Sequence, residues 1–572
     1  MTEADFKLTE GQDQAIQAAV RASHAVKAEP AVCVWSGFAG SGKTTCVQQV
    51  AAAVGEVVVV APTGRAALRV TEATGLIAST IHRWLYVPEI DEESGEMRFT
   101  RRDQVRGRDG KPLKIETPSS RLVIVDEASM LSASLFSDLY AVCKDLHLNL
   151  LLVGDAFQLP PITEPGAPSF SVFSDEFARA HHAERIFLTE IHRQAAENPI
   201  IRASMLVREG QARAGLDLLA QVRRPRLLDE AADVIDSGGV VIVHRNITRQ
   251  QLNNALRTTY GLGNAPLTRG EPLLVRRNTP SVNRYNGEIV FFDTWATKKG
   301  IAPEGSEQQL GATPWLIYPR KDAEPETIHF APALVSGNFV VLAVEEVYQT
   351  TKLHWGLLRR GAREWALHHK PGTKVNAKGQ YAPPAFLSAN LGYAMTAHGG
   401  QGSQWNRVLV GIEPSIRLDE EEGRRWVYTA ITRAAQRTQI SFLGRELPAV
   451  TSTRPLKTRQ ARPPAQRVLV IGDASGVICK ALESISQGAI KAMQDLIIED
   501  SLVTHEEADD VAKSYKGLVC VPRQDGTHPV KPNLLLAKAF LGHGRTVLAW
   551  DHEKQKFGDV GRVDDAGRRL VA

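Results

Sequence analysis

The chain has 572 residues, of which 43% are hydrophobic and 23% are charged, and its formal net charge at pH 7 is +4. A chain of this length is too long for one hydrophobic core, so we expect several domains. The composition is ordinary for a soluble globular protein, and the mild positive charge is compatible with a nucleic-acid partner without arguing for one.

Targeting segments and paired cysteines are not evident in the sequence. The first residues, MTEADFKLTEGQDQ, are polar and acidic, unlike a signal peptide, and no apolar run approaches the roughly 20 residues that span a bilayer. The five cysteines are scattered and form no C-x-x-C pair, which argues against a zinc site or a disulfide framework. We therefore expect a soluble protein of a reducing cytoplasm, without membrane contact.

Short, strongly apolar runs recur through the first 200 residues, with helical patterns between some of them. Such runs suit strands that are buried on both faces of a parallel sheet, and the alternation is typical of a doubly wound α/β domain. They are AVCVW (31–35), EVVVVAP (56–62), RLVIVDEA (121–128), LNLLLVGD (148–155) and RIFLTE (185–190). A second set, which predicts a second α/β lobe, comprises GGVVIVHR (238–245), RVLVGI (407–412) and TQISFLG (438–444).

Two stretches interrupt this α/β pattern. Residues 87–118 predict a polar β-hairpin. Its strands would be MRFTR (97–101) and LKIE (113–116), joined by a turn at the Asp-Gly pair 109–110. Residues near 298–385 are rich in glycine and proline and contain short strand patterns, which predicts a small β-barrel insertion.

A basic segment follows the second lobe. It covers residues 448–467 and includes TSTRPLKTRQARPPAQR, with five basic residues, three prolines and no acid. This composition is typical of a linker, and a tether that contacts phosphates is the alternative. Residues 468–572 start with the strand pattern VLVIGDA and predict a small α/β module of unknown role.

The strongest functional signal is the stretch from Gly37 to Thr44, GFAGSGKT, which fits G-x-x-x-x-G-K-[ST] between a predicted strand and a predicted helix. Glycines let the backbone curl so that its N–H groups face a phosphate, and the helix N-terminus adds partial positive charge. Lys43 would reach the terminal phosphates of ATP, and the Thr44 hydroxyl would hold Mg²⁺.

Further polar residues follow other predicted strands. Asp126 would anchor hydrated Mg²⁺, and the adjacent Glu127 would polarise the attacking water. Gln158, in GDAFQLPP, is placed to sense the γ-phosphate, with Asp155 as its support. Because the carboxyl ends of parallel strands lie at one edge of a sheet, we expect these segments to meet at one nucleotide.

Two arginines complete this prediction, Arg193 in LTEIHRQ and Arg433 in YTAITRA. Phosphoryl transfer builds charge on the equatorial oxygens, and an arginine finger is worth roughly 10³–10⁵ in rate. Both arginines belong to the second lobe or its edge. ATP held by one lobe and contacted by the other would close the cleft, and hydrolysis would release it.

Nine motifs occur in a fixed order along the chain. They are LTEGQ (8–12), GFAGSGKTT (37–45), APTGRAA (61–67), TIHRW (80–84), VDEASM (125–130), GDAFQLPP (154–161), LTEIHRQ (188–194), YAMTAHGGQGSQW (393–405) and VYTAITRA (427–434). Over roughly residues 8–445, this ordered set resembles the superfamily 1B helicases, particularly the RecD-like and phage Dda-like DNA helicases. A generic phosphate-loop ATPase would share only a few of these motifs.

The resemblance implies two RecA-like lobes with ATP between them, in a monomeric motor that moves 5′→3′ on single-stranded DNA and separates forked duplexes. It assigns residues 1–86 and 119–186 to lobe 1, 87–118 to a strand-separating pin, 187–297 and 386–447 to lobe 2, and 298–385 to an SH3-like domain that braces the pin. Residues 451–572 have no counterpart, and a replication or repair protein is the partner we expect for residues 468–572.

The resemblance also implies roles for individual residues. Catalysis would use Lys43, Asp126, Glu127, Gln158, Arg193 and Arg433. ATP would contact Gln12, through its adenine, and Gly37, Gly40, Ser41, Gly42, Lys43, Thr44 and Thr45, while Thr44 and Asp126 would hold Mg²⁺. DNA would contact Thr63, His82, Thr396 and His398.

Some positions depart from the family's pattern. Gly399 and Gly400 follow His398 where relatives commonly have a lysine, so one phosphate contact is missing or is supplied elsewhere. Gln404 stands where many relatives have Glu, which alters the expected ribose or Mg²⁺ contact.

The residues alone argue less strongly for DNA than for ATP. Trp84, Trp405 and Tyr428 lie beside motifs, where aromatic rings either stack on bases or belong to the core. An RNA helicase and a translocase that strips proteins without unwinding are alternatives. A further alternative is a recruitment module, in which the ATPase is a switch and residues 468–572 are the working surface.

Overall fold

The computed structural model describes most of residues 8–456 and five strands beyond them. The gaps before residue 456 are 91–96, 107–112, 114, 116, 162–169, 191–197, 264, 280–281, 283, 298–299, 302–312, 318–325, 345–354, 372–380, 382 and 445. The chain divides into two compact units, Met1–Arg69 with Ala78–Arg459, and Val70–Ile77 with Gln460–Ala572. None of the helices in the described ranges has the length and apolar character of a membrane span.

A six-stranded parallel sheet forms the core of lobe 1, in the order β3-β2-β6-β7-β1-β8. Its strands are β1 (Val32–Gly37), β2 (Val58–Ala61), β3 (Ala78–Thr80), β6 (Leu122–Val125), β7 (Asn149–Gly154) and β8 (Glu184–Leu188). Every residue of β1, β6 and β7 is buried, as expected for apolar strands covered on both faces. The predicted α/β fold of this lobe is confirmed, although β8 continues past the predicted lobe boundary at residue 186.

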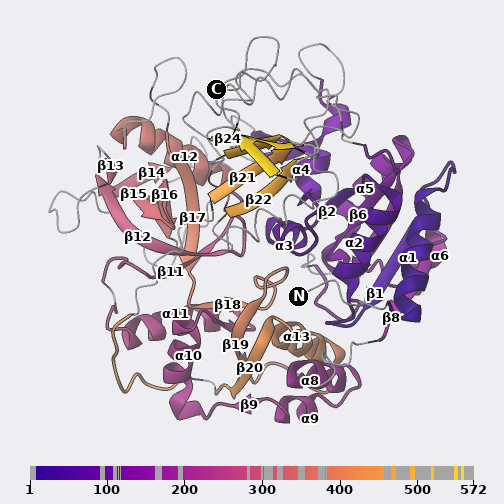
Figure 1. The fold of residues 1–572 in the computed structure, drawn as a ribbon. Helices are drawn as coiled ribbons and strands as arrows, with labels where there is room; N and C mark the ends of the chain where they lie inside the picture. Colours follow the sequence, from indigo (N-terminus) through magenta and orange to yellow (C-terminus); the bar gives the residue numbers. More distant parts are fainter. Residues whose placement is uncertain are drawn as a thin grey trace. The chain divides into compact units, whose positions relative to one another are not determined.

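Helices flank the sheet of lobe 1 (Figure 1). They are α1 (Glu10–Ser23), α2 (Lys43–Val54), α3 (Gly64–Thr74), α4 (Ile81–Leu85), α5 (Ala133–Asp145) and α6 (Asp175–Ala180). A capping box starts α1, because the side chains of Thr9 and Gln12 each accept a hydrogen bond from the other's backbone N–H. Ser132 and Ser174 cap the N-termini of α5 and α6.

The β-hairpin that interrupts lobe 1 pairs different strands from those predicted. Strand β5 (Met97–Arg101) is antiparallel to β4 (Tyr86–Ile90), and Glu89 lies opposite Arg98. The predicted pairing of residues 97–101 with 113–116 is therefore wrong. The observed partner is nearer in sequence, so closing the loop costs less entropy.

A second parallel sheet, in the order β18-β10-β19-β20-β9, forms the core of lobe 2 and confirms the predicted second α/β lobe. Its strands are β9 (Ala220–Gln221), β10 (Val240–Val243), β18 (Ala394–Thr396), β19 (Trp405–Ile412) and β20 (Ala434–Phe442). Its helices are α8 (Pro199–Arg208), α9 (Ala212–Asp217), α10 (Leu227–Asp236), α11 (Asn246–Thr259) and α13 (Glu421–Ile431). Helices α8, α9 and α13 share one hydrophobic cluster of this lobe, and α10 and α11 share another.

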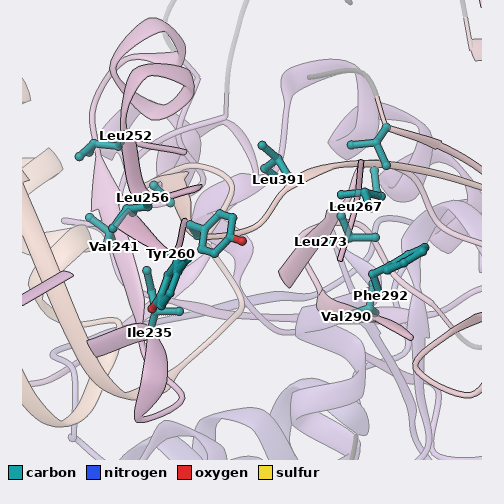
Figure 2. Packing of buried hydrophobic residues seen from close by; sticks show 14 of the residues in the cluster. Ile235, Val241, Leu252, Leu256, Tyr260, Leu267, Leu273, Val290, Phe292 and Leu391 are labelled. Atoms are coloured by element: carbon teal, nitrogen blue, oxygen red, sulfur yellow. The ribbon is translucent and has the colours of Figure 1, made fainter. Parts of the chain in front are cut away.

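Five strands close into a ring, because β11 pairs with β17, β17 with β16, β16 with β15, β15 with β12, and β12 with β11. The elements of this barrel and its flanks are β11 (Pro272–Val275), β12 (Ile289–Thr297), β13 (Gly300–Ile301), β14 (Thr313–Ile317), β15 (Glu326–Val335), β16 (Asn338–Val344), α12 (Trp355–His369) and β17 (Ala385–Leu391). The ring therefore uses strands on both sides of the predicted insertion at 298–385. The barrel and lobe 2 share one hydrophobic core. Leu273 and Phe292 of the barrel belong to the same buried cluster as Leu252 and Tyr260 of lobe 2 (Figure 2).

The segment predicted as a linker begins against lobe 2. The Arg454 guanidinium pairs with Asp233 at 2.7 Å, and the backbone N–H of Arg454 donates to the Thr259 carbonyl. In the second unit, the sheet order is β22-β21-β23-β24-β25, parallel except for the β24–β25 pair. Its strands are β21 (Gln466–Ile471), β22 (Ile490–Asp495), β23 (Gly517–Cys520), β24 (Thr546–Asp551) and β25 (Lys556–Asp559). Strand β21 thus begins two residues before the predicted start of the module.

Candidate nucleotide and nucleic-acid site

The phosphate loop connects the last residue of β1, Gly37, to the first residue of α2, Lys43. Gly40 and Gly42 turn the chain with φ angles of 83° and 77°, which other residues rarely adopt. A Cβ at Gly37 would lie 2.7 Å from the Ser41 Oγ, so the loop closes tightly over this position. The residues predicted to bind phosphates therefore form one tight loop at a helix N-terminus, where backbone N–H groups favour anions.

The Lys43 side chain folds over this loop. Its Nζ donates to the carbonyl oxygens of Gly37, at 2.9 Å, and Phe38, at 2.8 Å. Burial lowers the pKa of Lys43, against the attraction of Asp155, Glu127 and Asp126, which raises it. The predicted phosphate-binding cation thus lies within the field of the predicted catalytic carboxylates. Thr44 and Thr45 follow it in the first turn of α2.

Asp126 and Glu127 follow β6 directly. Burial, together with repulsion from Glu127, raises the pKa of Asp126 to about 6. Glu127 has a φ of 52°, in the left-handed region that non-glycine residues occupy only when their surroundings enforce it. Its carboxylate lies 3.8 Å from the Arg69 guanidinium. Two adjacent carboxylates favour a nearby cation. Mg²⁺ prefers oxygen ligands and keeps several waters, so the Asp126 carboxylate and the Thr44 hydroxyl are the kind of ligands it would take here.

Asp155 and Gln158 follow β7 and are both buried. The side-chain Oε1 of Gln158 has no hydrogen-bond partner among the described residues. A buried amide oxygen without a partner is costly, so this side chain suits a role in which a ligand or water completes its bonding.

Gln12 lies against the phosphate loop. Its Oε1 accepts from the Thr9 N–H at 3.1 Å, and its Nε2 donates to the Ser41 carbonyl at 3.0 Å. The capping box thus engages the side chain that the resemblance assigns to adenine, and the adenine contact stays a prediction.

Of the two predicted arginine fingers, the structure places one. Arg433 follows α13, is 3% exposed, and its Nε donates to the Thr429 carbonyl at 3.1 Å. Burial lowers its pKa, and Glu127 of lobe 1 is the strongest of the charges that oppose this effect. An arginine of lobe 2 therefore lies within the field of the predicted catalytic carboxylate of lobe 1. Arg193 lies outside the described residues.

The predicted DNA contacts fall into two groups. Thr63 caps α3, where its Oγ1 accepts from the Ala66 N–H at 3.2 Å. The Thr396 Oγ1 accepts from the Gly399 N–H at 3.3 Å, and the half-buried His398 is two residues further on. These sites form one group, since a Cβ at Gly402 would lie 3.2 Å from the Thr63 Oγ1.

His82 belongs to the other group, at the base of the hairpin. Its exposed ring lies 5.4 Å from the rings of both Tyr86 and Phe99, and Phe99 is 49% exposed. An exposed ring pair beside basic residues is the kind of surface on which bases stack, so this group remains a candidate DNA contact.

Two of the aromatic residues beside motifs belong to the core. Tyr428 is 0% exposed and Trp84 is 5% exposed, so neither ring is available to stack on a base. Trp405 is half-buried.

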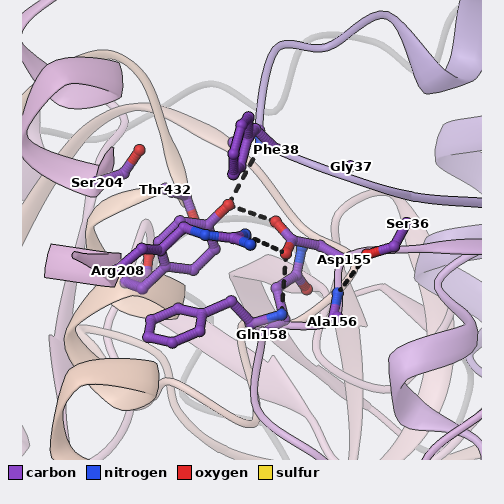
Figure 3. Close-up of polar contacts among 12 residues, drawn as sticks. Ser36, Gly37, Phe38, Asp155, Ala156, Gln158, Ser204, Arg208 and Thr432 are labelled. Atoms are coloured by element: carbon purple, nitrogen blue, oxygen red, sulfur yellow. Dashed lines mark hydrogen bonds and ion pairs between the residues drawn. The ribbon is translucent and has the colours of Figure 1, made fainter. Parts of the chain in front are cut away.

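The interface of the two lobes contains residues that the motifs did not predict. The Arg208 Nη1 donates to the Asp155 Oδ1 at 3.0 Å, and Figure 3 shows this contact beside Phe38. The Arg69 Nη2 donates to the Gln404 Oε1 at 3.3 Å, at one of the positions that departs from the family pattern. Both arginines lie outside the nine motifs, so nothing in the local sequence marks them.

Comparison with known proteins is consistent with this arrangement. Residues 7–229 match the model of an AAA domain, and residues 391–439 match that of a UvrD-like helicase C-terminal domain. The ATP-dependent RecD2 DNA helicase of Deinococcus radiodurans is 28% identical over 427 residues, 71% of this chain and 46% of that protein. The ATP-dependent DNA helicase Pif1 of a Psychrobacter species is 24% identical over 462 residues, 72% of this chain and 65% of that protein.

The chain therefore spans between about half and two thirds of the length of these two relatives. A solved structure, Bacteroides Pif1 bound to single-stranded DNA, aligns with a TM-score of 0.42 and 17% identity, over 77% of this chain and 93% of that one. With an AAA domain followed by a UvrD-like helicase C-terminal domain, and with RecD-like proteins among its relatives, the chain is similar to the superfamily 1B helicases, as the motif order predicted.

Proposed function

We propose that this chain is an ATP-dependent DNA helicase that moves 5′→3′ along single-stranded DNA and separates forked duplexes. One observation carries the proposal: buried Arg433 of lobe 2 and Lys43 of lobe 1 both lie within the field of Glu127. A nucleotide at this point would be bound by one lobe and contacted by the other. Binding and hydrolysis would then close and open the two lobes.

Each residue of the site has a distinct task in this proposal. Lys43 binds the terminal phosphates, Glu127 orients the attacking water, and Arg433 stabilises charge that develops on the transferred phosphoryl group. Asp126 and Thr44 would hold Mg²⁺, which neutralises phosphate charge when bound. Gln158 has a buried amide oxygen without a partner among the described residues, which suits a sensor of the γ-phosphate side of the site.

The choice of DNA as substrate rests on the relatives, which are named DNA helicases, and on two local features. The exposed ring of His82 lies 5.4 Å from the ring of Phe99, which is on a hairpin strand that also carries Arg98. Thr63 and the 396–398 segment supply polar groups from both lobes. The 5′→3′ direction follows from the resemblance. RNA unwinding, or translocation that displaces proteins without unwinding, would use the same ATP site.

Replacing the phosphate-loop lysine tests the ATP site. Lys43→Ala removes the cation that faces the terminal phosphates, so we expect ATP hydrolysis to fall roughly 10²–10³-fold. Exposed Lys27, on the same lobe, provides the matched control, and Lys27→Ala should hydrolyse ATP like the unmodified chain. Normal turnover by Lys43→Ala would refute the site.

Substrate and direction need separate measurements on the unmodified chain. ATP hydrolysis is measured with oligo-dT and with oligo-rU, and unwinding is measured on duplexes with a 5′ or a 3′ single-stranded tail. We expect stimulation by DNA and unwinding of the 5′-tailed duplex alone. Stimulation by RNA alone, or hydrolysis without unwinding on either tail, would replace this proposal with one of the alternatives.

A further inference from the structure

We propose that the Tyr428 hydroxyl is a positioning group that couples lobe 2 to the phosphate loop, so that ATP turnover responds to the bound strand. This inference rests on the proposed helicase function and assigns a role that the nine motifs leave open. Tyr428 lies in α13 of lobe 2, and its hydroxyl bonds two groups of lobe 1.

The hydroxyl makes both of its bonds from a fully buried side chain. The O–H donates to the Asp155 carboxylate, and the same oxygen accepts the Ala39 N–H at 3.2 Å. Tyr428 and Asp155 are both 0% exposed. Burial and the neighbouring carboxylate raise the pKa of Tyr428, so its hydroxyl stays protonated and is the donor. Hydrogen bonds to a buried charge are among the stronger ones in proteins.

A second residue of lobe 2 contacts the same loop. Arg208 pairs with the other oxygen of Asp155 at 3.0 Å, and its guanidinium lies 4.4 Å from the centre of the Phe38 ring (Figure 3). Lobe 2 therefore contacts two consecutive residues of the phosphate loop, Phe38 and Ala39, immediately before Gly40. A shift of α13 or α8 would move the backbone that wraps the phosphates.

The residues just after the C-terminal end of α13 are bonded to the segment that carries predicted DNA contacts. The Arg433 carbonyl accepts from the Trp405 N–H at 2.9 Å. The Arg433 Nη1 reaches the Ser403 carbonyl at 3.4 Å. This segment begins at Thr396 and His398, so a continuous set of contacts joins the predicted strand site to Tyr428.

A tyrosine has the chemistry that this position requires. A phenol donates one hydrogen bond and accepts others, so it satisfies a carboxylate and an N–H group at once. Phenylalanine would keep the ring, which packs edge-on against Phe157 at 5.3 Å, but would leave the Ala39 N–H and one oxygen of Asp155 without this partner. Tyr428→Phe therefore removes the proposed coupling with little change in packing.

The test compares this variant with a second buried tyrosine in the full-length chain. Tyr260 is 3% exposed, and its hydroxyl oxygen lies 3.1 Å from both an Asp236 carboxylate oxygen and the Ala232 carbonyl, two acceptors for its single proton within lobe 2. We expect Tyr428→Phe to lose about tenfold in ATP turnover with saturating oligo-dT, the equivalent of one hydrogen bond to a charge. Tyr260→Phe should lower the thermal midpoint and keep the DNA stimulation of the unmodified chain.

A double-mutant cycle makes the coupling specific. Asp155→Asn should lower DNA-stimulated turnover as Tyr428→Phe does, and the double variant should be little worse than either single one. Fully additive losses would overturn the inference, and so would unchanged stimulation in Tyr428→Phe. If Tyr428→Phe does not fold, Arg208→Lys, which keeps the charge but loses the planar contact on Phe38, takes its place in the cycle. Failure of the unmodified chain to respond to DNA would instead refute the proposed function itself.

Discussion

Two buried groups in this protein have the same chemistry and different surroundings. Each joins a carboxylate, an arginine and a tyrosine. Glu271, Arg257 and Tyr393 lie where lobe 2 meets the barrel. Asp155, Arg208 and Tyr428 lie where lobe 1 meets lobe 2.

The two groups differ in the polar atoms around them and in the exposure of their arginines. Arg257 also donates to the carbonyl oxygens of Gly263 and Ala265, and Glu271 also accepts from the Thr268 N–H. Next to Asp155, by contrast, the Gln158 Oε1 has no partner within the described ranges, and the Arg208 side chain is 15% exposed. A fully satisfied network fixes one conformation, whereas a partly satisfied one can rearrange at lower cost. We therefore assign the first group to stability and the second to motion.

The largest effect is expected when the group of Glu271, Arg257 and Tyr393 is broken. Glu271→Ala leaves the Arg257 charge buried without its partner, so we expect the free energy of unfolding to fall by about 3–5 kcal/mol. Urea denaturation, followed by tryptophan fluorescence, measures the change. Glu209→Ala, at the exposed end of α8, provides the control. A loss below about 1 kcal/mol would show that this network does not hold the barrel to lobe 2.

A smaller effect is expected at the interface between the lobes. Arg208→Gln removes the charged donor of Asp155 and leaves it the Tyr428 hydroxyl and the Phe157 N–H. We therefore expect the free energy of unfolding to fall by about 1–3 kcal/mol, the cost of one lost hydrogen bond to a buried charge. The same denaturation experiment applies, with Arg213→Gln as control, because the Arg213–Asp217 pair is exposed and 3.8 Å long. A loss as large as that of Glu271→Ala would contradict the division between the two groups.

The smallest effect is expected for an ion pair at the surface, because such a pair has opposite charges in contact but little burial. Arg21 and Glu184 approach to 2.6 Å, but their side chains are 61% and 46% exposed. Water and salt screen such a pair, so Arg21→Ala should cost about 0.2–1 kcal/mol. The cost should shrink further in 1 M salt. A larger cost would mean that ion pairing itself, rather than burial, determines how much each of these arginines and carboxylates contributes to stability.

The parts of the fold that sequence predicted correctly depend on local patterns. The phosphate loop follows from glycine spacing between a strand and a helix, and both parallel sheets follow from short apolar runs. Pairing between distant segments was harder to predict. The sequence favoured 113–116 as the partner of Met97–Arg101, although Tyr86–Ile90 takes that place. It also gave no sign that β11, β12 and β17 would close the barrel, because ring closure is a property of strand order.

The same limit applies to the site. Lys43, Asp126 and Gln158 were identifiable because each sits in a motif at the end of a strand. Arg208 was not, since it is one of many arginines at helix ends and only tertiary packing brings it to Asp155. Tyr428 lies in a motif, but its role depends on burial between lobes, which periodicity within α13 does not reveal.

Gly402 sets a geometric limit on how the lobes come together. It has a φ of +72°, and a Cβ there would lie 3.0 Å from the Cβ of Ala66 in α3 and 3.1 Å from its backbone nitrogen. The backbone of Gly402 in lobe 2 therefore packs directly against Ala66 of lobe 1. A single added carbon would therefore hold the two lobes a few tenths of an ångström apart, beside the predicted DNA contacts Thr63 and Thr396.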